Sequence, residues 1–159
     1  MSEITLGTRT REQAAIYFEK SAAPCIRQWL PQSVETLEQA LENYEKTLLP
    51  GADSYGRTIL LDGHYIGDIW CYCIDPDDTP NAMLSYCIFE PEFWNRGIGT
   101  KAAALFLKEI RERFSLKSVG AFTYADHGAS IRVLEKNGFR LAEEFAEDGR
   151  LSGYFEREL

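Results

Sequence analysis

A glycine-containing turn between a predicted strand and a long predicted helix constrains the fold of this 159-residue chain most strongly. The strand is expected over 83–89 and the helix over 97–114, and the turn between them reads Trp94-Asn95-Arg96-Gly97-Ile98-Gly99. The apolar face of the helix is predicted to be Ala102, Leu105, Phe106 and Ile110. Glycines at 97 and 99 let backbone N–H groups converge at the positive end of a helix. The turn therefore predicts a site for a phosphate or pyrophosphate.

The other elements follow from apolar periodicity and turn residues. A helix is expected from Thr10, which forms a capping box with Gln13, to about Ser21, and another over 34–48. The first helix would turn Ala14, Ala15, Tyr17 and Phe18 toward a core. In the second, apolar residues recur at helical spacing, namely Leu37, Ala40, Leu41, Tyr44 and Leu48. Further strands are expected over 57–61, 65–74, 118–124, 139–145 and 151–157, with a short helix over 130–137 that Gly138 ends. This order predicts an α/β protein with a mixed sheet and helices on both faces.

The composition narrows the class of protein. A chain of 159 residues with 45% hydrophobic and 26% charged residues predicts one globular domain, spanning 1–159. A net charge of -8 disfavours nucleic acid as a partner and suits an amine-bearing one. The N-terminus lacks the apolar stretch of a secretory signal, and no apolar run approaches the ~18 residues of a membrane span. A cytoplasmic protein with four reduced cysteines, no membrane association and no metal is expected.

A second motif lies downstream, His127-Gly128-Ala129-Ser130-Ile131-Arg132-Val133-Leu134-Glu135-Lys136-Asn137-Gly138-Phe139. Together the two motifs resemble the GNAT superfamily of acetyl-CoA-dependent N-acetyltransferases. The first resembles its [RQ]-x-x-G-x-[GA] motif, with Trp94 in the first place. The second resembles N-x-x-S-x-x-V-L-E-K-x-G-F, typical of the branch that contains ribosomal-protein N-terminal acetyltransferases (RimJ/RimL-like). The resemblance implies a GNAT-type, mostly antiparallel central sheet and acetyl transfer from acetyl-CoA directly to a primary amine of a protein or small molecule. Members of the family often form homodimers.

The resemblance also implies a set of site residues. The backbone of Ile88 and Phe89 would pair with the pantetheine arm of acetyl-CoA. The pyrophosphate would be held by the backbone amides of Asn95, Arg96, Gly97, Ile98, Gly99 and Thr100. Trp94, His127 and Ser130 complete the cofactor-binding set. Ser130 and His127 are also the catalytic candidates, Ser130 as the group that protonates the departing thiolate and His127 as a weaker candidate for proton transfer.

Two positions depart from the family pattern. His127 stands where the family usually has an Asn that bonds the pantetheine arm, and His can also donate and accept hydrogen bonds. Leu134 stands where many members carry a Tyr that acts as general acid, and the motifs assign no general base. A non-catalytic acyl-CoA binding or sensing module on the same fold is therefore the alternative function. A nucleotide-binding oxidoreductase is disfavoured because residue 102 is Ala where a third glycine is expected.

Several other residues have a structural and a functional interpretation. Cys71 and Cys73 are expected on one face of a strand, packed in the core, and His64 in a solvated turn. Ser130 is predicted to cap its helix. Trp29 belongs either to the core or to an acceptor pocket. Glu143, Glu144, Glu147 and Asp148 form either a solvated acidic hairpin or an attraction for a cationic amine.

Overall fold

The protein contains one sheet built from seven strands. They are β1 Ile4–Thr8, β2 Tyr55–Leu61, β3 His64–Asp75, β4 Asn81–Ile88, β5 Ser118–Tyr124, β6 Arg140–Glu147 and β7 Arg150–Glu158. Their spatial order is β1-β2-β3-β4-β5-β7-β6, and only β4 and β5 are parallel neighbours. The structure, a computed structural model, describes residues 2–31 and 33–159. The predicted mixed, mostly antiparallel sheet is confirmed.

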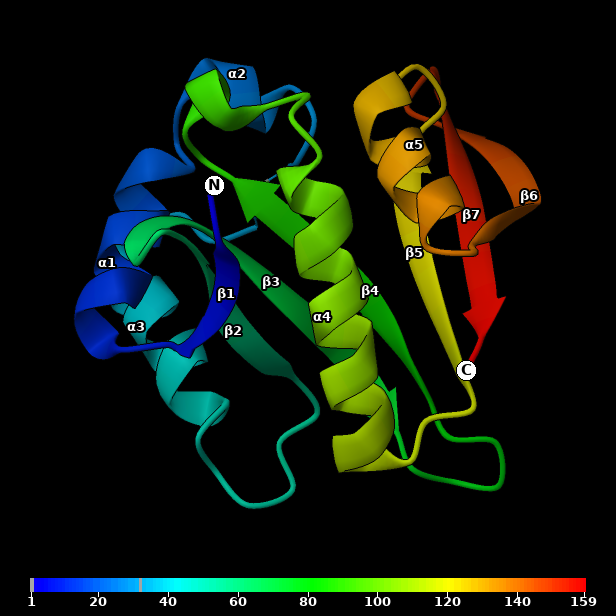
Figure 1. The fold of residues 1–159 in the computed structure, drawn as a ribbon, viewed down its shortest axis with the longest axis horizontal. Coiled ribbons are helices and arrows are strands. Elements are labelled where there is room, and N and C mark those ends of the chain that lie inside the picture. The colour runs from blue at the N-terminus through cyan, green and yellow to red at the C-terminus, as the bar shows by residue number, and fades with distance from the viewer. Residues whose placement is uncertain (1, 32) are drawn as a thin grey trace.

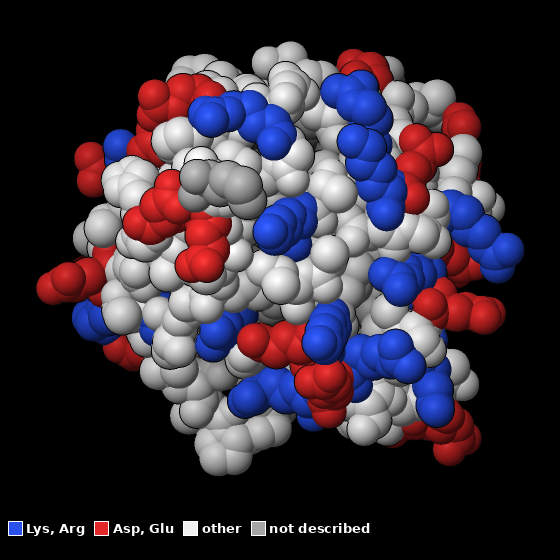
Figure 2. Space-filling view, in the orientation of Figure 1, with Lys and Arg blue, Asp and Glu red and all other residues white. Residues whose placement is uncertain are grey.

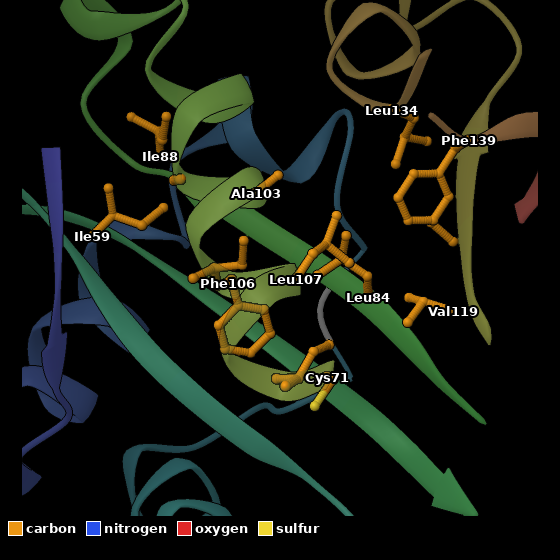
Figure 3. Packing of buried hydrophobic residues seen from close by; sticks show 14 of the residues in the cluster. Ile59, Cys71, Leu84, Ile88, Ala103, Phe106, Leu107, Val119, Leu134 and Phe139 are labelled. Atoms are coloured by element: carbon orange, nitrogen blue, oxygen red, sulfur yellow. The ribbon is translucent and has the colours of Figure 1, made fainter. Parts of the chain in front are cut away.

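Helices cover both faces of this sheet, as predicted (Figure 1). They are α1 Arg11–Lys20, α2 Pro24–Arg27, α3 Leu37–Lys46, α4 Ile98–Phe114 and α5 Gly128–Lys136, with one 3-10 turn, η1, at Pro91–Phe93. The main core lies between α4 and the sheet, where Phe106 and Ile110 are fully buried (Figure 3). A smaller cluster of Ile26, Cys87 and Phe89 joins α2 to the opposite face. In the described ranges, no helix has the length and apolarity needed to cross a bilayer.

The strands β4 and β5 pair only at one end. Asn81, Ala82 and Met83 pair with Ser118, Val119 and Gly120, and beyond these residues no pairing links the two strands. Figure 1 shows them diverging toward the end of the sheet where α2 and α5 lie. On the other side of β4, a Cβ at Gly67 of β3 would stand 2.2 Å from the carbonyl oxygen of Cys87, so only glycine allows this close approach. The divergence therefore leaves one edge of β4 without a strand partner beyond Met83, while β3 pairs closely with the other edge.

Helix α1 begins as the sequence predicts, at the capping box of Thr10 and Gln13. Helix α3 begins at Leu37 rather than near Val34, and a second capping box, of Thr36 and Gln39, fixes its start. The helix expected over 34–48 is shorter, however, and none of its residues is fully buried, so its apolar stripe covers the molecule only loosely. The prediction also assigned no strand to Ile4–Thr8, which forms the edge strand β1.

Three local predictions are wrong. Leu105 on α4 is 38% exposed, and the buried face includes Ala103 and Leu107 instead. Cys73 is exposed whereas Cys71 is buried, because a bulge between Tyr72 and Asp75, with a φ of 51° at Cys73, breaks the alternation of β3. All four cysteines are free.

The third concerns α5, which begins at Gly128 rather than Ser130. His127 takes the N-cap position, and no side chain caps the helix there. Ser130 therefore lies inside the first turn, and its hydroxyl is not needed as the expected cap. The end of the helix is as predicted, since Gly138 follows with a φ of 82°.

Candidate active site

A groove of about 590 Å³ opens where β4 and β5 diverge. Its walls come from α2 and the residues after it, from β4 and β5, from the turn before α4, and from α5. Of the predicted site residues it is lined by Ile88, Trp94, Asn95, Arg96, Gly97, Ile98, Gly99, Thr100, His127 and Ser130. Sequence segments more than 30 residues apart thus meet in one cavity.

The backbone of β4 presents its hydrogen-bonding groups to the groove in alternation. The N–H of Phe89 donates to the carbonyl of Ile66 on β3, at 3.0 Å, so Phe89 turns its groups away from the groove. Backbone groups of successive residues in a strand point to opposite sides, so the N–H and C=O groups of Ile88 and Tyr86 point toward β5. The carbonyl of Ile88 accepts a hydrogen bond from the indole Nε1 of Trp94 at 2.7 Å. Phe89 is buried in the smaller cluster and does not line the groove, contrary to the role that the resemblance implied for it.

The glycine turn closes the groove at the beginning of α4. Gly97 has a φ of 78°, which favours glycine, and a Cβ there would meet no atom within 4 Å. Gly99 packs against the ring of Tyr86 and the side chain of Val133. A Cβ atom added at Gly99 would lie 3.3 Å from the Tyr86 ring and 3.4 Å from the Val133 side chain. The first N–H groups of α4 have no partner within the helix. The turn therefore leaves open space in front of unpaired donors, as an anionic ligand requires.

Cationic side chains surround this end of the groove. Arg96, Arg132 and Lys136 line it, and they are its only Lys and Arg residues in the described part of the chain. Arg132 donates to the side-chain oxygen of Asn95 at 3.4 Å, which joins α5 to the turn. In Figure 2, Lys and Arg side chains gather over α5 and the beginning of α4, although the chain as a whole carries a net charge of -8.

Ser130 and Tyr86 lie together in the wall between α5 and β4. Burial raises the pKa of the Tyr86 hydroxyl to about 12, and the adjacent Ser130 side chain acts in the opposite direction by hydrogen bonding to it. Tyr86 is therefore neutral throughout the physiological range and keeps its O–H as a donor. The structure thus supplies a Tyr hydroxyl beside Ser130, although Leu134 is buried in the core and carries none.

His127 takes part in a cluster that bridges the outer end of the groove. Its ring stacks on Trp29, with centroids 4.2 Å apart. The guanidinium of Arg150 lies 3.5 Å from the ring centroid of Tyr124 and 5.3 Å from that of Trp29. Arg150 also donates to the carbonyl of Gln28 at 3.0 Å. Trp29 is half-buried and lines the groove, so its assignment to the acceptor pocket fits the geometry better than a core position.

Burial lowers the pKa of His127. The nearby Arg150 and Arg132 lower it further, and Asp126 opposes them. A lowered pKa makes the imidazole neutral at pH 7. His127 can then accept one hydrogen bond and donate another in the groove, as the predicted contact with a pantetheine arm requires.

Other candidate residues lie outside the groove. Glu143, Glu144, Glu147 and Asp148 are exposed on β6 and its hairpin, and none lines the cavity. His64 is exposed at the start of β3, as predicted. Among the described residues, no group of three His, Cys, Asp or Glu side chains is placed to hold a metal ion.

The sequence analysis missed Tyr86 and Arg150. Tyr86 lies in an ordinary apolar strand, and nothing in its neighbours signals that it faces Ser130, 44 positions away. Arg150 follows the Asp148-Gly149 turn and carries no motif. Both acquire their partners only through the order of strands in the sheet.

The chain is similar to known acetyltransferases in sequence and in fold. A model of the acetyltransferase (GNAT) domain matches residues 4–140. Among solved structures, a RimL ribosomal-protein α-N-acetyltransferase in complex with coenzyme A superposes with a TM-score of 0.83 at 19% identity, covering 98% of this chain and 94% of that chain. Spermidine N-acetyltransferase from Vibrio cholerae, in complex with CoA and spermine, gives a TM-score of 0.86 at 13% identity, covering 98% and 95%. Aminoglycoside acetyltransferase AAC(6')-Ib, in complex with coenzyme A, gives 0.81 at 18% identity, covering 98% and 95%.

No curated protein sequence matches closely enough to count as a relative. The family model nevertheless spans most of the chain, and it includes the glycine turn, α4 and α5. On this ground the chain belongs to the GNAT acetyltransferase family.

Proposed function

We propose that this protein transfers the acetyl group of acetyl-CoA to a primary amine. The observation that carries the proposal is the groove between β4 and β5, which ends at the Gly97 turn and the unpaired N–H groups of α4. Open space, backbone donors and the cations Arg96, Arg132 and Lys136 suit the phosphates of a CoA molecule. Membership of the acetyltransferase family supports the same assignment.

The reaction needs little from the protein beyond position and proton transfer. When bound, acetyl-CoA supplies a thioester: the amine nitrogen bonds to its carbonyl carbon, the C–S bond breaks, and a proton passes in net terms from nitrogen to sulfur. The diverging edge of β4 offers the backbone N–H of Ile88 to an extended ligand. Trp94 holds the carbonyl of Ile88 and so fixes the end of this edge beside the turn.

Proton transfer is assigned to Ser130. Its hydroxyl faces the groove beside Tyr86, and the neutral Tyr86 can return a proton through it. His127 is neutral and lies at the outer end of the groove, where we assign it to ligand contact before proton transfer. A neutral imidazole there also avoids placing a further positive charge next to an incoming ammonium.

The acceptor is a protein N-terminus, a protein side chain or a small-molecule amine. The solved structures with this fold include a ribosomal-protein, a spermidine and an aminoglycoside acetyltransferase, so the fold alone does not select among them. We further propose a cytoplasmic location, which the four free cysteines support.

Calorimetric titration with acetyl-CoA tests the cofactor site. Gly97→Asp places a negative charge in the open space at the turn, and we expect it to weaken acetyl-CoA binding by about ten-fold or more. Gly51→Asp is the matched control, because Gly51 has a φ of 76°, open space around its Cβ position and no part in the groove. Gly51→Asp introduces the same backbone strain and the same negative charge as Gly97→Asp, and it should bind acetyl-CoA like the wild type.

Equal loss in both variants, or no binding by the folded wild type, would contradict the proposal. Tight binding without turnover on any amine would instead favour the acyl-CoA sensing module, for which Leu134 in place of the family's Tyr is the motivating observation.

A further inference from the structure

We propose that the acceptor is a monoamine whose non-reacting part is aromatic or aliphatic, and that amines with two or more positive charges are poor acceptors. This inference rests on the acetyl transfer proposed above and names the substrate class of the same groove. It is carried by the side chains at the end of the groove beside α2, on the face of the sheet opposite α4.

That end, which we term the acceptor end, is apolar. It consists of Ile26, Trp29, Leu30, Cys87 and Phe122. Ile26 and Cys87 are buried together, and Leu30 packs on their cluster. Alternation along β4 places Cys87 on the α2 face, opposite the face on which Tyr86 meets α5. An amine entering from α2 therefore passes apolar and aromatic side chains before it reaches the groups around Ser130.

No carboxylate among the described residues lines the groove. Its charged residues are Arg96, Arg132 and Lys136, all cationic and all toward the turn that suits phosphates. Three carboxylates in the surrounding elements are already paired with cations, and one of them is Asp68, buried near Cys87 and paired with Arg9 at 3.4 Å. Asp126 pairs with Arg150 at 3.4 Å, and Glu90 pairs with Lys20 at 3.4 Å. The net charge of -8 is thus carried elsewhere on the molecule.

This distribution discriminates against a second ammonium group. A cation that enters an apolar pocket loses hydration and recovers it only from a paired carboxylate or an open aromatic face. The ring of Trp29 is already stacked on His127 and adjoins the guanidinium of Arg150. Arg150 also repels a further cation at this place. The reacting amine avoids this loss of hydration free energy because it must lose its extra proton, and with it the positive charge, before it attacks.

The groove continues onto an aromatic surface that can hold the rest of the acceptor. Phe122 lines the groove and is still 54% exposed. Its ring contacts those of Phe145 and Tyr154, with centroids 5.9 Å and 5.2 Å away. Apolar atoms of an acceptor gain burial against these rings, whereas a polyamine chain finds no carboxylate there and gains only the weak attraction of an exposed ring face.

The test compares hexylamine with hexamethylenediamine, which differ only in a second terminal amine. Each is titrated by calorimetry into the CoA-loaded protein, and each is offered with acetyl-CoA while release of the CoA thiol is followed. We expect affinity and kcat/KM for hexylamine to exceed those for the diamine by about ten-fold or more. Phenylethylamine should match or exceed hexylamine, and spermidine should resemble the diamine.

A designed carboxylate provides the reciprocal test. Leu30→Glu places an acid at the acceptor end, and Leu30→Gln is its uncharged control. We expect the Glu variant alone to shift the ratio of diamine to monoamine affinity by about ten-fold or more toward the diamine, with CoA affinity equal in both variants.

The outcomes separate the two proposals. Preference of the wild type for the diamine or spermidine, with turnover present, overturns the monoamine inference and leaves acetyl transfer standing. Binding of hexylamine over the diamine without any turnover supports the selectivity of the groove and contradicts the enzymatic function. A Glu variant that behaves like the Gln variant also overturns the inference, because the charge of the acceptor end would then not decide selectivity.

Discussion

At the scale of single residues, the proposed function assigns proton transfer to Ser130, and the structure places the Tyr86 hydroxyl beside it. The Ser is on α5 and the Tyr on β4, and burial keeps the Tyr protonated with a pKa raised to about 12. The protonated hydroxyl of Tyr86 can donate a hydrogen bond to Ser130 and orient it. In the family pattern, a Tyr at position 134 would supply a hydroxyl instead. Gly99 supports the arrangement by leaving room for the Tyr86 ring.

Removal of the Tyr86 hydroxyl tests this pairing. In Tyr86→Phe the ring keeps its packing against Gly99, so CoA affinity and stability should change little, while kcat should fall by about ten-fold or more because Ser130 loses its partner. Steady-state kinetics for both substrates, together with CoA calorimetry, measure the separation. Tyr72→Phe is the control, since Tyr72 is half-buried on β3 away from the groove. An unchanged kcat in Tyr86→Phe would remove the residue from the mechanism.

At the scale of elements, α1 is attached to β3 through buried polar groups as well as apolar contacts. Asp68 on β3 is 1% exposed and pairs with Arg9, just before α1, at 3.4 Å. Its Oδ1 accepts a hydrogen bond from Tyr65 at 2.7 Å. Desolvation dominates and raises the pKa of Asp68 to about 6, against the lowering effects of Arg9 and Tyr65.

This raised pKa makes the attachment of α1 sensitive to pH. Because the folded state holds the proton of Asp68 more tightly than the unfolded state, the stabilising contribution is complete below about pH 4 and is lost as the pH rises through about 6. Relative to Asp68→Asn, the wild type should lose about 1 to 1.5 kcal/mol of unfolding free energy between about pH 5 and about pH 8. Urea unfolding of both proteins at the two pH values measures it.

Asp78→Asn, in the exposed loop before β4, is the control that removes a carboxylate but keeps Asp68, and it should lose stability over the same pH interval as the wild type. A wild type that gains stability relative to Asp68→Asn as the pH rises would mean that the ion pair with Arg9 outweighs desolvation.

At the scale of the whole molecule, the sheet consists of two halves, β1 to β4 and β5 to β7, which share only the short parallel pairing at one end. Side chains hold the halves together on either side of the opening. On the α4 face, the side-chain amide of Asn137 on α5 donates to the carbonyl of Thr100 on α4 at 3.1 Å. On the opposite face, Arg150 of β7 reaches the backbone at Gln28 and the ring of Trp29. These two contacts, and that of Arg132 with Asn95, join the two halves at the sides of the groove.

Removal of the Arg150 side chain should loosen the outer end of the groove. In Arg150→Ala, amide hydrogen exchange over 24–30 should accelerate by about ten-fold, because the guanidinium no longer holds the carbonyl of Gln28 and the ring of Trp29. KM for the amine should rise more than the Kd for CoA, since Arg150 lies away from the glycine turn and reaches the CoA contact of His127 only through Trp29. Arg140→Ala, on the exposed edge strand β6, is the matched control. Equal exchange in both variants would show that Arg150 does not hold α2.

Much of this architecture follows from the sequence. Period-two apolar runs, Asp-Gly turns and one capping box specify β2 to β7, both hairpins and the beginning of α1, because each depends on neighbours within one or two turns of chain. The Gly97 turn also belongs to this class, since its backbone requirement is local. The edge strand β1 and the bulge at Cys73 escaped prediction because pairing with β2 and β4 decides them.

What the sequence determined by itself is thus most of the elements and the glycine turn, and its motifs indicated the family. The tertiary structure alone decided which side chains meet in the groove. Tyr86 lies beside Ser130, Trp29 contacts His127 and Arg150, and the Phe89 N–H points away from the groove, because the tertiary arrangement of the strands and helices places them there. These contacts join residues distant in the chain, and a local pattern carries no information about them since side-chain direction depends on the partner strand.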